Sequence, residues 1–517
     1  MLLTLVYQFA LFIHNHLLSL LIWLPVLGGV LAIAFNGDRY PQRARVIALI
    51  TSLITLLLCV PLYLGFNPAL SSMQFQENIP WITVYNINYA LGVDGISLPL
   101  ILLTVFTTLL VILAAWRSIN LRVAQYMAAF LLMQGMMVGT FAATDSILFY
   151  VFWEAILIPM YLSIGVWGSD NRSYASIKFF LYTFFGSALM LIALLYLGVH
   201  NPTHDFLIAH FYPIPLSLPV QIWVFIAFLI AFAVKIPMWP LHTWLPDAHT
   251  EAPAGGSVVL AALMLKLGGY GFLRFTLPIV PDASRLLDGF MIALALIAIV
   301  YIGLVALAQV DMKRLIAYSS IAHMGFVVLG CFMLFPIMTH NHNTLMAYMS
   351  LEGAMVQMIS HAFSSGAMFL AVGMLAYRFR SRLIKNYGGL ATSMPLLASF
   401  FMLFAMSNVG LPGTAGFVGE FMIIFSAMQA SFWITTLAAS TLIISAAYTL
   451  YMYKRVFFGE ITNPLVAKTS DIHGFEKLVF ILLSLAIIFI GIYPAPLLTI
   501  MHASIDSILH WSLQTKL

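Results

Sequence analysis

Long apolar runs alternate with short polar connections along the chain. Runs of about 18–25 apolar residues match helices that cross a hydrocarbon core about 30 Å thick, and about fourteen such runs are present. They cover residues 18–36, 43–65, 97–117, 123–143, 145–167, 174–199, 220–249, 255–277, 286–308, 313–335, 352–378, 393–428, 431–457 and 475–498. The pattern predicts an all-α polytopic membrane protein, with residues 1–17 forming a short surface helix ahead of the first span.

Two of these runs are interrupted by prolines, glycines and charged residues. Residues 234–272 read VKIPMWPLHTWLPDAHTEAPAGGSVVLAALMLKLGGYGF, and residues 407–421 read SNVGLPGTAGFVGEF. Proline breaks a helix, and unpaired backbone groups persist at membrane depth only where protein or water lines them. A broken helix beside buried ionisable groups is typical of a transporter site, so we expect an ion-translocating protein.

The chain also shows an internal duplication. The segment FFGSALMLIALLYL (184–197) resembles FSSGAMFLAVGMLA (363–376), and the two lie in expected spans that are five positions apart in the chain, an odd number. The copies therefore insert with opposite orientation, as in inverted-repeat transporters. We expect N-terminal helices 1–3 in residues 1–122, a first five-helix repeat in 123–277, a second, inverted repeat in 286–457, and a C-terminal helix in 475–517, with one broken helix in each repeat.

Composition narrows the class of protein. The chain is 62% hydrophobic and 8% charged, which excludes a soluble domain. Its two cysteines, Cys59 and Cys331, form no C-x-x-C pattern, so iron–sulfur, zinc-ribbon and c-type haem sites are unsupported. We expect neither a metal nor a bound cofactor in this chain. The formal charge of +4 includes no basic run that would indicate nucleic acid.

Basic residues give an expected orientation. Most of the 22 lysines and arginines fall on alternate connections, which places them on one side of the membrane. The positive-inside rule assigns that side to the cytoplasm, so both termini face outward. The N-terminus lacks a positive n-region and a small-residue cleavage site, so we expect no removable signal peptide.

Several ionisable residues fall inside the expected spans. A lysine at the centre of a membrane helix costs at least roughly 2.5–3.5 kcal/mol, and such residues usually mark ion paths. Burial and an opposite charge shift a pKa in opposite directions, so a buried acid and a buried lysine can exchange a proton at modest cost. The candidates for a proton relay are Glu154, Lys178, Lys235, Lys266, His323, His361 and Glu420.

Each candidate has a structural alternative. Glu154 could neutralise a lysine and hold two helices together, and Lys178, near the start of its span, could extend to the interface. A histidine inside a span could serve an interhelical hydrogen bond rather than proton transfer. His242 and His249 suggest a metal only weakly, because no cysteine accompanies them and prolines disrupt their spacing.

The central motif resembles a known family. KIPMWPLHTWLPDAHTEAPAGGSVVLAALMLKLGGYGFLRF is similar to the signature of the antiporter-like membrane subunits of proton-pumping NADH:quinone oxidoreductase, respiratory complex I, of the M (chain-4) type. Supporting segments are LGVDGISLPL (91–100), FYVFWEAILIPMYL (149–162), DMKRLIAYSSIAHMGF (311–326) and LPGTAGFVGEF (411–421). The resemblance covers nearly the whole chain, and the residues before the first span are its main departure.

The resemblance assigns roles to the candidates. Glu154 and Lys235 would form a regulatory ion pair, Lys266 would be the central relay, and Glu420 would be the terminal group. Two further groups would connect these across the middle, with water: His323 and His361.

The resemblance also implies partners. NADH, FMN, iron–sulfur clusters and quinone would lie on other subunits. The neighbours would be lipids and other membrane-arm subunits, including adjacent antiporter-like ones, in a bacterial cytoplasmic membrane. Two alternatives stay open: a subunit of a multisubunit cation/proton antiporter without redox chemistry, and a structural spacer without its own channel.

Overall fold

The structure is a computed structural model that describes residues 15–35, 39–461 and 463–517. Within these ranges, 13 helical runs are long and apolar enough to cross a membrane. They are α2 (Leu17–Ala34), α3 (Pro41–Leu64), α4 (Ser97–Ser118), α5 (Val123–Ala142), α6 with α7 (Ser146–Trp167), α8 (Arg172–His200), α10 (Leu218–Lys235), α12 to α14 (Ala254–Ile279), α16 with α17 (Asp288–Leu307), α18 (Met312–Phe332), α20 (Thr344–Phe379), α24 with α25 (Phe432–Phe457) and α27 (Phe475–Ile492).

Two shorter apolar helices take the place of the remaining expected span. They are α22 (Pro395–Val409) and α23 (Ala415–Ala427), and together they correspond to the broken run 393–428. The expected helical membrane architecture is thus confirmed, and the protein is a multi-pass membrane protein. The surface helix expected for residues 1–17 lies almost entirely outside the described residues.

Several runs contain shorter pieces, and short helices connect the spans. The pieces are α6 (Ser146–Ala155), α7 (Leu157–Trp167), α12 (Ala254–Val259), α13 (Leu265–Gly271), α14 (Leu277–Ile279), α16 (Asp288–Leu296), α17 (Gly303–Leu307), α24 (Phe432–Ala439) and α25 (Thr441–Phe457). The connecting helices are α9 (Ile208–Phe211), α11 (Trp244–Glu251), α15 (Pro281–Leu286), α19 (Leu334–Asn341), α21 (Leu390–Ser393), α26 (Pro464–Lys468) and α28 (Ala495–Leu513).

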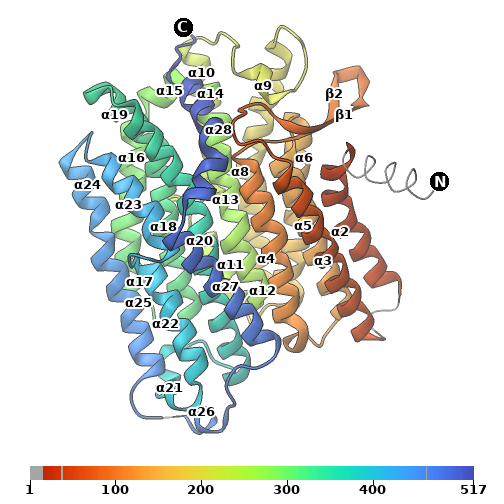
Figure 1. Ribbon diagram of the computed structural model, residues 1–517, viewed down its shortest axis with the longest axis vertical. Coiled ribbons are helices and arrows are strands. Elements are labelled where there is room, and N and C mark those ends of the chain that lie inside the picture. The colour runs from red at the N-terminus through yellow and green to blue at the C-terminus, as the bar shows by residue number, and fades with distance from the viewer. Residues whose placement is uncertain (1–14, 36–38, 462) are drawn as a thin grey trace.

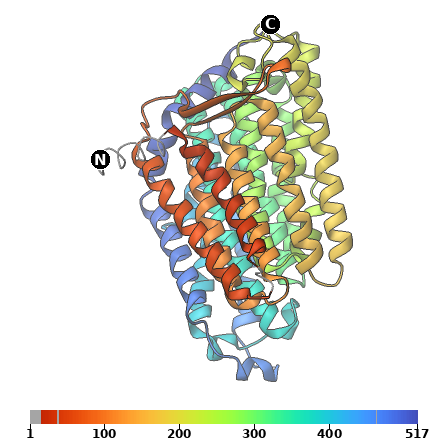
Figure 2. The ribbon, with the colours of Figure 1, turned by 90° about the vertical axis from the view of Figure 1, so that its right-hand side faces the viewer.

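The spans run side by side, so the bundle has two distinct ends (Figure 1). The lower end in Figure 1, here called the basic face, carries α21, α26 and the connections with Arg122, Arg172 and Arg382. The upper end, the hairpin face, carries α9, a β-hairpin and the C-terminus. Figure 2 shows α2 and α3 as a pair of helices along one side of the bundle. The side of the membrane on which each face lies stays a prediction.

The β-hairpin is an addition to the expected all-α architecture. Strand β1 (Gln74–Ile82) pairs antiparallel with β2 (Ile87–Val93), and Asn86 adopts a left-handed conformation at the turn. Glu77 of β1 accepts a hydrogen bond from the backbone N–H of Leu18 at 2.8 Å. That bond satisfies one of the free N–H groups at the start of α2 and attaches the hairpin to the bundle.

The most deeply buried spans lie in the middle of the chain. Every residue from Gly255 to Ile279 in the α12 to α14 run is buried, and α18 and α20 are nearly as enclosed. Helix α20 has 36 residues, which makes it about 54 Å long at 1.5 Å per residue. These three spans form the centre against which the other helices pack. The inverted repeat and its boundaries stay predictions.

The two breaks appear where the sequence predicts them. Helix α10 ends at Lys235, and the Trp244 indole N–H donates to the carbonyl of Val234 at 2.9 Å, which satisfies a free carbonyl at that helix end. Between α22 and α23, Gly410 has φ +84°, a conformation that glycine adopts without steric cost. A Cβ on Gly416 would lie only 1.9 Å from the carbonyl oxygen of Ser407, so glycine permits the close return of the chain.

Candidate functional site

Four ionisable side chains form a series through the centre of the bundle. Lys266 Nζ lies 2.7 Å from His361 Nδ1, and His323 Nδ1 lies 2.6 Å from Glu420 Oε1. The two imidazole rings have centroids 5.9 Å apart. All four residues are buried, with exposed fractions of 4% or less. The structure therefore brings together four of the residues that the sequence singled out.

Lys266 lies in an unusual helix. Residues Leu260–Met264 and Phe272–Thr276, on either side of α13, are π-helical, a form that occurs frequently at functional sites. The ammonium of Lys266 donates to the carbonyl of Ala261 at 2.5 Å, in addition to its contact with His361. A Cβ on Gly268 would lie 2.8 Å from the backbone of α10, so α13 packs directly against the helix that ends in Lys235.

Glu420 lies in α23, shortly after the second break. Its Oε1 accepts from His323 and also from Gln357 Nε2, the latter at 3.0 Å. His323 Nε2 is 3.3 Å from the hydroxyl of Tyr448. Glu420 Oε2 is buried and has no hydrogen-bond partner among the residues that the structure describes. The carboxyl group therefore keeps one oxygen available to a further proton donor or acceptor.

Glu154 and Lys235 do not form a contact ion pair in this conformation. No oxygen of Glu154 lies within 4.0 Å of Lys235 Nζ, although both residues face the same region. The Lys235 ammonium lies 5.1 Å from the ring centroid of Trp153, and within the described part of the chain neither it nor Glu154 Oε1 has a hydrogen-bond partner. The direct contact between Glu154 and Lys235 that the family resemblance implies is therefore not formed in this structure.

Lys178 lies apart from the buried series. Its Nζ pairs with Asp247 Oδ2 at 2.7 Å, and Arg314 reaches the other oxygen of Asp247 at 3.3 Å. The Lys178 side chain is 22% exposed. This environment matches the alternative in which Lys178 serves an interfacial ion pair, and the structure does not bring it to Lys266 or Glu420.

The two histidines of the first break lie in buried surroundings. His249 stacks on Phe369 with centroids 4.4 Å apart, and no group in residues 15–35, 39–461 or 463–517 is hydrogen-bonded to either of its ring nitrogens. Among the described residues, no group of three or more His, Cys, Asp or Glu side chains could hold a metal ion.

Two buried charged groups were missed by the sequence analysis. Glu352 is the first residue of its expected span, but α20 begins at Thr344, so this carboxyl is a buried acid well inside a span, as Glu420 is. Arg274, near the end of the expected span 255–277, was not among the candidates, but it is 4% exposed and its guanidinium lies 2.6 Å from Asp94. Asp94 belongs to the segment LGVDGISLPL and precedes α4.

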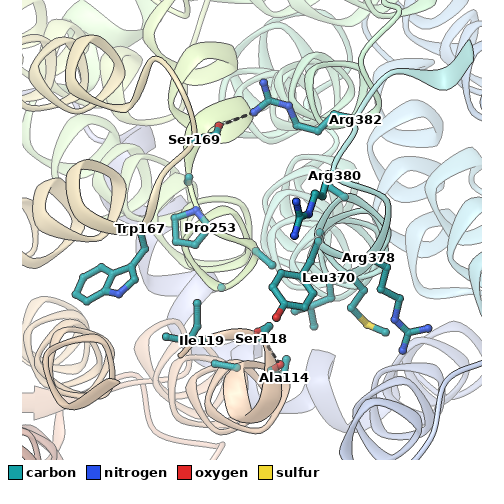
Figure 3. A pocket seen from close by; sticks show the side chains of 18 of the residues that line it. Ala114, Ser118, Ile119, Trp167, Ser169, Pro253, Leu370, Arg378, Arg380 and Arg382 are labelled. Carbon is teal, nitrogen blue, oxygen red and sulfur yellow. Dashed lines mark hydrogen bonds between the residues drawn. The ribbon is translucent and has the colours of Figure 1, made fainter. Parts of the chain in front are cut away.

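A cavity of about 1200 Å³ opens at the basic face (Figure 3). Figure 3 shows Arg378, Arg380 and Arg382 around one side of it and Trp167 at the other. Leu370 of α20 is one of the residues that line it. Leu370 lies ten residues before Arg380, the residue that follows α20, and this separation corresponds to a depth of about 15 Å at 1.5 Å per residue. Water can therefore approach the centre of the bundle from this face.

The buried series has the chemistry of proton transfer. An amine, an imidazole and a carboxyl group each bind and release a proton, and an imidazole can accept at one nitrogen and release from the other. His361 Nε2 and Glu420 Oε2 have no hydrogen-bond partner in the part of the chain that the structure describes, which leaves atoms for such exchange. The distances within each contact, 2.6 and 2.7 Å, are those of hydrogen bonds along which protons move.

Two family models match the chain. The model described as NADH-ubiquinone oxidoreductase chain 4, amino terminus, matches residues 45–144. The model described as NADH:quinone oxidoreductase/Mrp antiporter, TM, matches residues 143–445. Together these models cover residues 45–445, which include most of α3, the first break and the whole buried series.

Curated relatives and solved structures agree with these models. The chain is 46% identical over 495 residues to NADH-quinone oxidoreductase subunit M of Rhodobacter capsulatus, covering 93% of this chain and 94% of that protein. It is 41% identical over 492 residues to NADH-ubiquinone oxidoreductase chain 4 of Marchantia polymorpha, covering 95% and 96%. A chain of respiratory complex I from Thermus thermophilus with bound NADH matches at a TM-score of 0.86 and 31% identity, covering 96% of this chain and 100% of that one.

The relation to antiporters is more distant. A chain of the Mrp complex from Dietzia sp. DQ12-45-1b matches at a TM-score of 0.79 but only 19% identity, covering 96% of this chain and 52% of that one, and so shows a shared fold alone. The chain 4 model and the relatives with 41–46% identity instead name subunits of NADH:quinone oxidoreductase. The chain belongs to the family of NADH-quinone oxidoreductase subunit M, the chain 4 membrane subunits of complex I.

Proposed function

We propose that this chain translocates protons across the membrane as part of NADH:quinone oxidoreductase, while other subunits carry out electron transfer. The observation that carries the proposal is the buried series from Lys266 through His361 and His323 to Glu420. Ionisable groups in hydrogen-bond contact at membrane depth are costly, and such groups in membrane proteins serve ion transport in most cases.

The second half of the chain would conduct protons along this series. A protonated Lys266 donates from Nζ to His361 Nδ1, and His361 releases a proton from Nε2 to water between the two rings. His323 then takes up a proton and passes one from Nδ1 to Glu420 Oε1. Each elementary charge moved against 100 mV requires about 2.3 kcal/mol, so the redox reaction must supply the work.

The first half would control the supply of protons to Lys266. Glu154 in contact with Lys235 would hold the lysine charged, and their separation would release its proton toward Lys266. The open pair in this structure corresponds to the separated state, in which Trp153 provides the nearest stabilising contact for the ammonium. The close packing of α13 on α10 supports transfer between the two lysines.

The cavity at the basic face supports uptake of protons from that side. Three ionisable residues line it: Glu251, Asp311 and Lys313. Although Lys313 lines the cavity, most of its surface is buried. Under the positive-inside rule this face lies in the cytoplasm of a bacterial cell and both termini lie in the periplasm. Release would then occur at the hairpin face.

The remaining parts of the reaction would belong to partner subunits. NADH, FMN, the iron–sulfur clusters and quinone would be bound there, and this chain would hold no redox centre. Its direct neighbours would be other membrane-arm subunits, including adjacent antiporter-like ones, together with lipids.

The decisive experiment replaces the central lysine in the intact complex. Inverted membrane vesicles with Lys266→Met should lose NADH-driven acidification of the lumen together with NADH:quinone turnover, because transport and redox chemistry are coupled. The control is Lys477→Met, the same substitution at an exposed lysine of α27, which should retain both rates. Assembly of each complex is confirmed first.

Two other results would overturn the proposal. Normal pumping and turnover with Lys266→Met would show that this buried lysine is structural. Absence of NADH-linked proton movement in the unmodified membranes would favour the alternative of a cation/proton antiporter without redox chemistry.

A further inference from the structure

A second, smaller pocket adjoins the cavity at the basic face. It has a volume of about 370 Å³ and lies between the end of α4 and the start of α27, so we call it the interface groove. Most of its walls are apolar, with side chains that include Leu113, Trp116, Phe475 and Leu478. The rings of Trp116 and Phe475 meet edge to face, with centroids 5.3 Å apart. Because α4 ends and α27 begins here, the groove lies where two membrane spans reach the polar boundary.

The interface groove and the cavity share part of their lining. Four residues line both: Ala114, Arg117, His473 and Glu476. On the apolar side of the groove, Phe475 and Leu478 are 39% and 42% exposed, so this side is open at the surface of the bundle. An apolar groove along the spans that continues into a polar cavity beyond their ends matches the two parts of a phospholipid, an acyl chain and a headgroup.

The cavity carries an excess of positive charge. Seven lysines and arginines line it, against four aspartates and glutamates. Three of these acids already have basic partners. Glu476 lies 2.6 Å from Arg378, and Arg382 contacts two further acids at 3.5 and 3.2 Å, which are Glu251 and Asp311. The excess of three positive charges is therefore left for an anion to neutralise.

The guanidinium groups of Arg117 and Arg380 have no carboxylate partner in the described part of the chain. Arg117 is 2.6 Å from His473 Nε2, an imidazole rather than a counter-charge. Arg380 has φ +52° at the end of α20, a conformation that is uncommon for residues other than glycine. Figure 3 shows its side chain directed into the cavity, whereas that of Arg378 is directed away. Since a guanidinium can donate two parallel hydrogen bonds to a phosphate, both arginines suit a phosphate ligand.

We propose that the cavity and the interface groove together bind one anionic phospholipid. Its headgroup lies in the cavity at Arg117 and Arg380, and one acyl chain lies in the groove against Trp116 and Phe475. This inference concerns binding and does not rest on proton transfer. The cavity volume of about 1200 Å³ exceeds the roughly 300–1,000 Å³ of a pocket for a drug-sized ligand, so a headgroup leaves room for water.

Two other interpretations of the same residues must be separated from this one. Basic residues are enriched at the cytoplasmic ends of membrane spans whatever their further function, so these arginines could serve orientation alone. A free anion such as inorganic phosphate could occupy the cavity without using the groove. The phospholipid is favoured because the open apolar groove adjoins the excess positive charge.

The experiment places the intact complex in phosphatidylcholine nanodiscs that contain increasing fractions of phosphatidylglycerol with a photoreactive group on its acyl chain. Mass spectrometry should locate saturable crosslinks in residues 113–116 and 475–478. Each arginine near an anionic lipid contributes a preference of about fivefold, so Arg117→Gln with Arg380→Gln should raise the half-saturating fraction about thirtyfold. The matched control is Arg455→Gln, an exposed arginine in the last turn of α25 outside both pockets, which should leave that fraction unchanged.

Three results would overturn the proposal. One is an equal half-saturating fraction in the double variant and the control, which would leave the arginines a role in orientation alone. Another is equal labelling by photoreactive phosphatidylcholine, which would show that the groove takes any lipid. The third is binding of inorganic phosphate that the double variant loses, without saturable phosphatidylglycerol crosslinks, which would identify a free-anion site.

A single replacement keeps the test decisive if the double variant does not assemble. Arg380→Gln removes an exposed side chain for which the described residues provide neither an ion pair nor a hydrogen bond, so we expect it to assemble. An increase of about fivefold in its half-saturating fraction would support the lipid site, and an unchanged fraction would refute it.

Discussion

The buried ion pair between Asp94 and Arg274 provides a quantitative test of the packing described above. Their side chains are 3% and 5% exposed, and Arg274 approaches Asp94 Oδ2 at 2.6 Å. Asp94 also accepts from the backbone N–H groups of Ile96 and Ser97 at 3.1 and 3.0 Å. The pair joins the start of α4 to the helical run that carries Lys266. Its loss should therefore affect both stability and the position of the relay.

The expected magnitude follows from burial. Asp94→Asn keeps the shape of the side chain but leaves the Arg274 guanidinium without a counter-charge. Removing one partner of a buried ion pair costs about 3–5 kcal/mol. Arg378 and Glu476 form a matched control, since they are also 2.6 Å apart but 17% and 22% exposed. Glu476→Gln should cost at most about 1 kcal/mol, as for surface ion pairs.

The pair should also respond to pH in a defined direction. Burial alone would raise the pKa of Asp94, but the adjacent Arg274 charge outweighs it and holds the pKa below its ordinary value. An acid with a depressed pKa in the folded state stabilises fully above its unfolded pKa of about 3.9. That stabilisation is then lost as the pH falls through the lower, folded pKa. At neutral pH its contribution should be constant.

The assay is thermal unfolding of the purified complex, with Asp94→Asn, Glu476→Gln and the double replacement Asp94→Leu with Arg274→Met. The single change at Asp94 should lower the unfolding midpoint far more than Glu476→Gln does. The double replacement should recover much of the loss, because apolar residues of similar volume can replace a buried pair at little cost. Equal effects of the two single changes would refute the argument from burial.

Two further predictions concern a helix break and the C-terminus. Gly416→Ala should prevent stable assembly, because its Cβ would overlap the carbonyl of Ser407, whereas Gly289→Ala, which meets nothing within 4 Å, should be tolerated; the amount of assembled complex in membranes is measured. Burial lowers the pKa of Lys516 to about 7 despite Asp282 nearby. Between pH 7 and about 10.4 only the undocked lysine binds the extra proton, so docking of residues 514–517 should strengthen as the pH rises over that range. Hydrogen exchange of these residues checks this, and Lys516→Met should abolish the dependence.

The buried series was predictable because charge is costly in a membrane. The sequence pattern alone identified four of its residues, because each interrupts an apolar run: Lys266, His323, His361 and Glu420. The structure places them in one series. The order of contacts was not predictable from helical periodicity, because it depends on how α13, α18, α20 and α23 pack. An ionisable residue in an apolar run is not always part of the series. Lys178 lies near a helix end, and this position permits it to pair with Asp247 at the interface.

Other features were missed for identifiable reasons. The start of α20 was placed eight residues late, although Asn343 is a typical N-cap residue and accepts from the backbone N–H of Met346 at 3.2 Å. That cap would have located Glu352 inside the span. The hairpin was missed because QFQENIPWI and INYALGV are short segments between much stronger apolar signals.

The two halves of the candidate path differ in the hydrogen bonds that hold their ionisable side chains. In the second half, Lys266 and Glu420 each have hydrogen-bond partners among the neighbouring side chains. In the first half, Lys235 Nζ has none among the described residues, and Glu154 is hydrogen-bonded only to the neutral groups of Ser187 and Tyr150. A buried charge without a hydrogen bond is held only weakly by an aromatic ring or by the carboxyl end of a helix, such as that of α10. A rearrangement or added water is therefore needed in the first half before a proton can move, whereas the second half requires water mainly between the two imidazole rings. Control of transport by the rest of the complex should accordingly act on Glu154 and Lys235, the pair whose geometry is free to change.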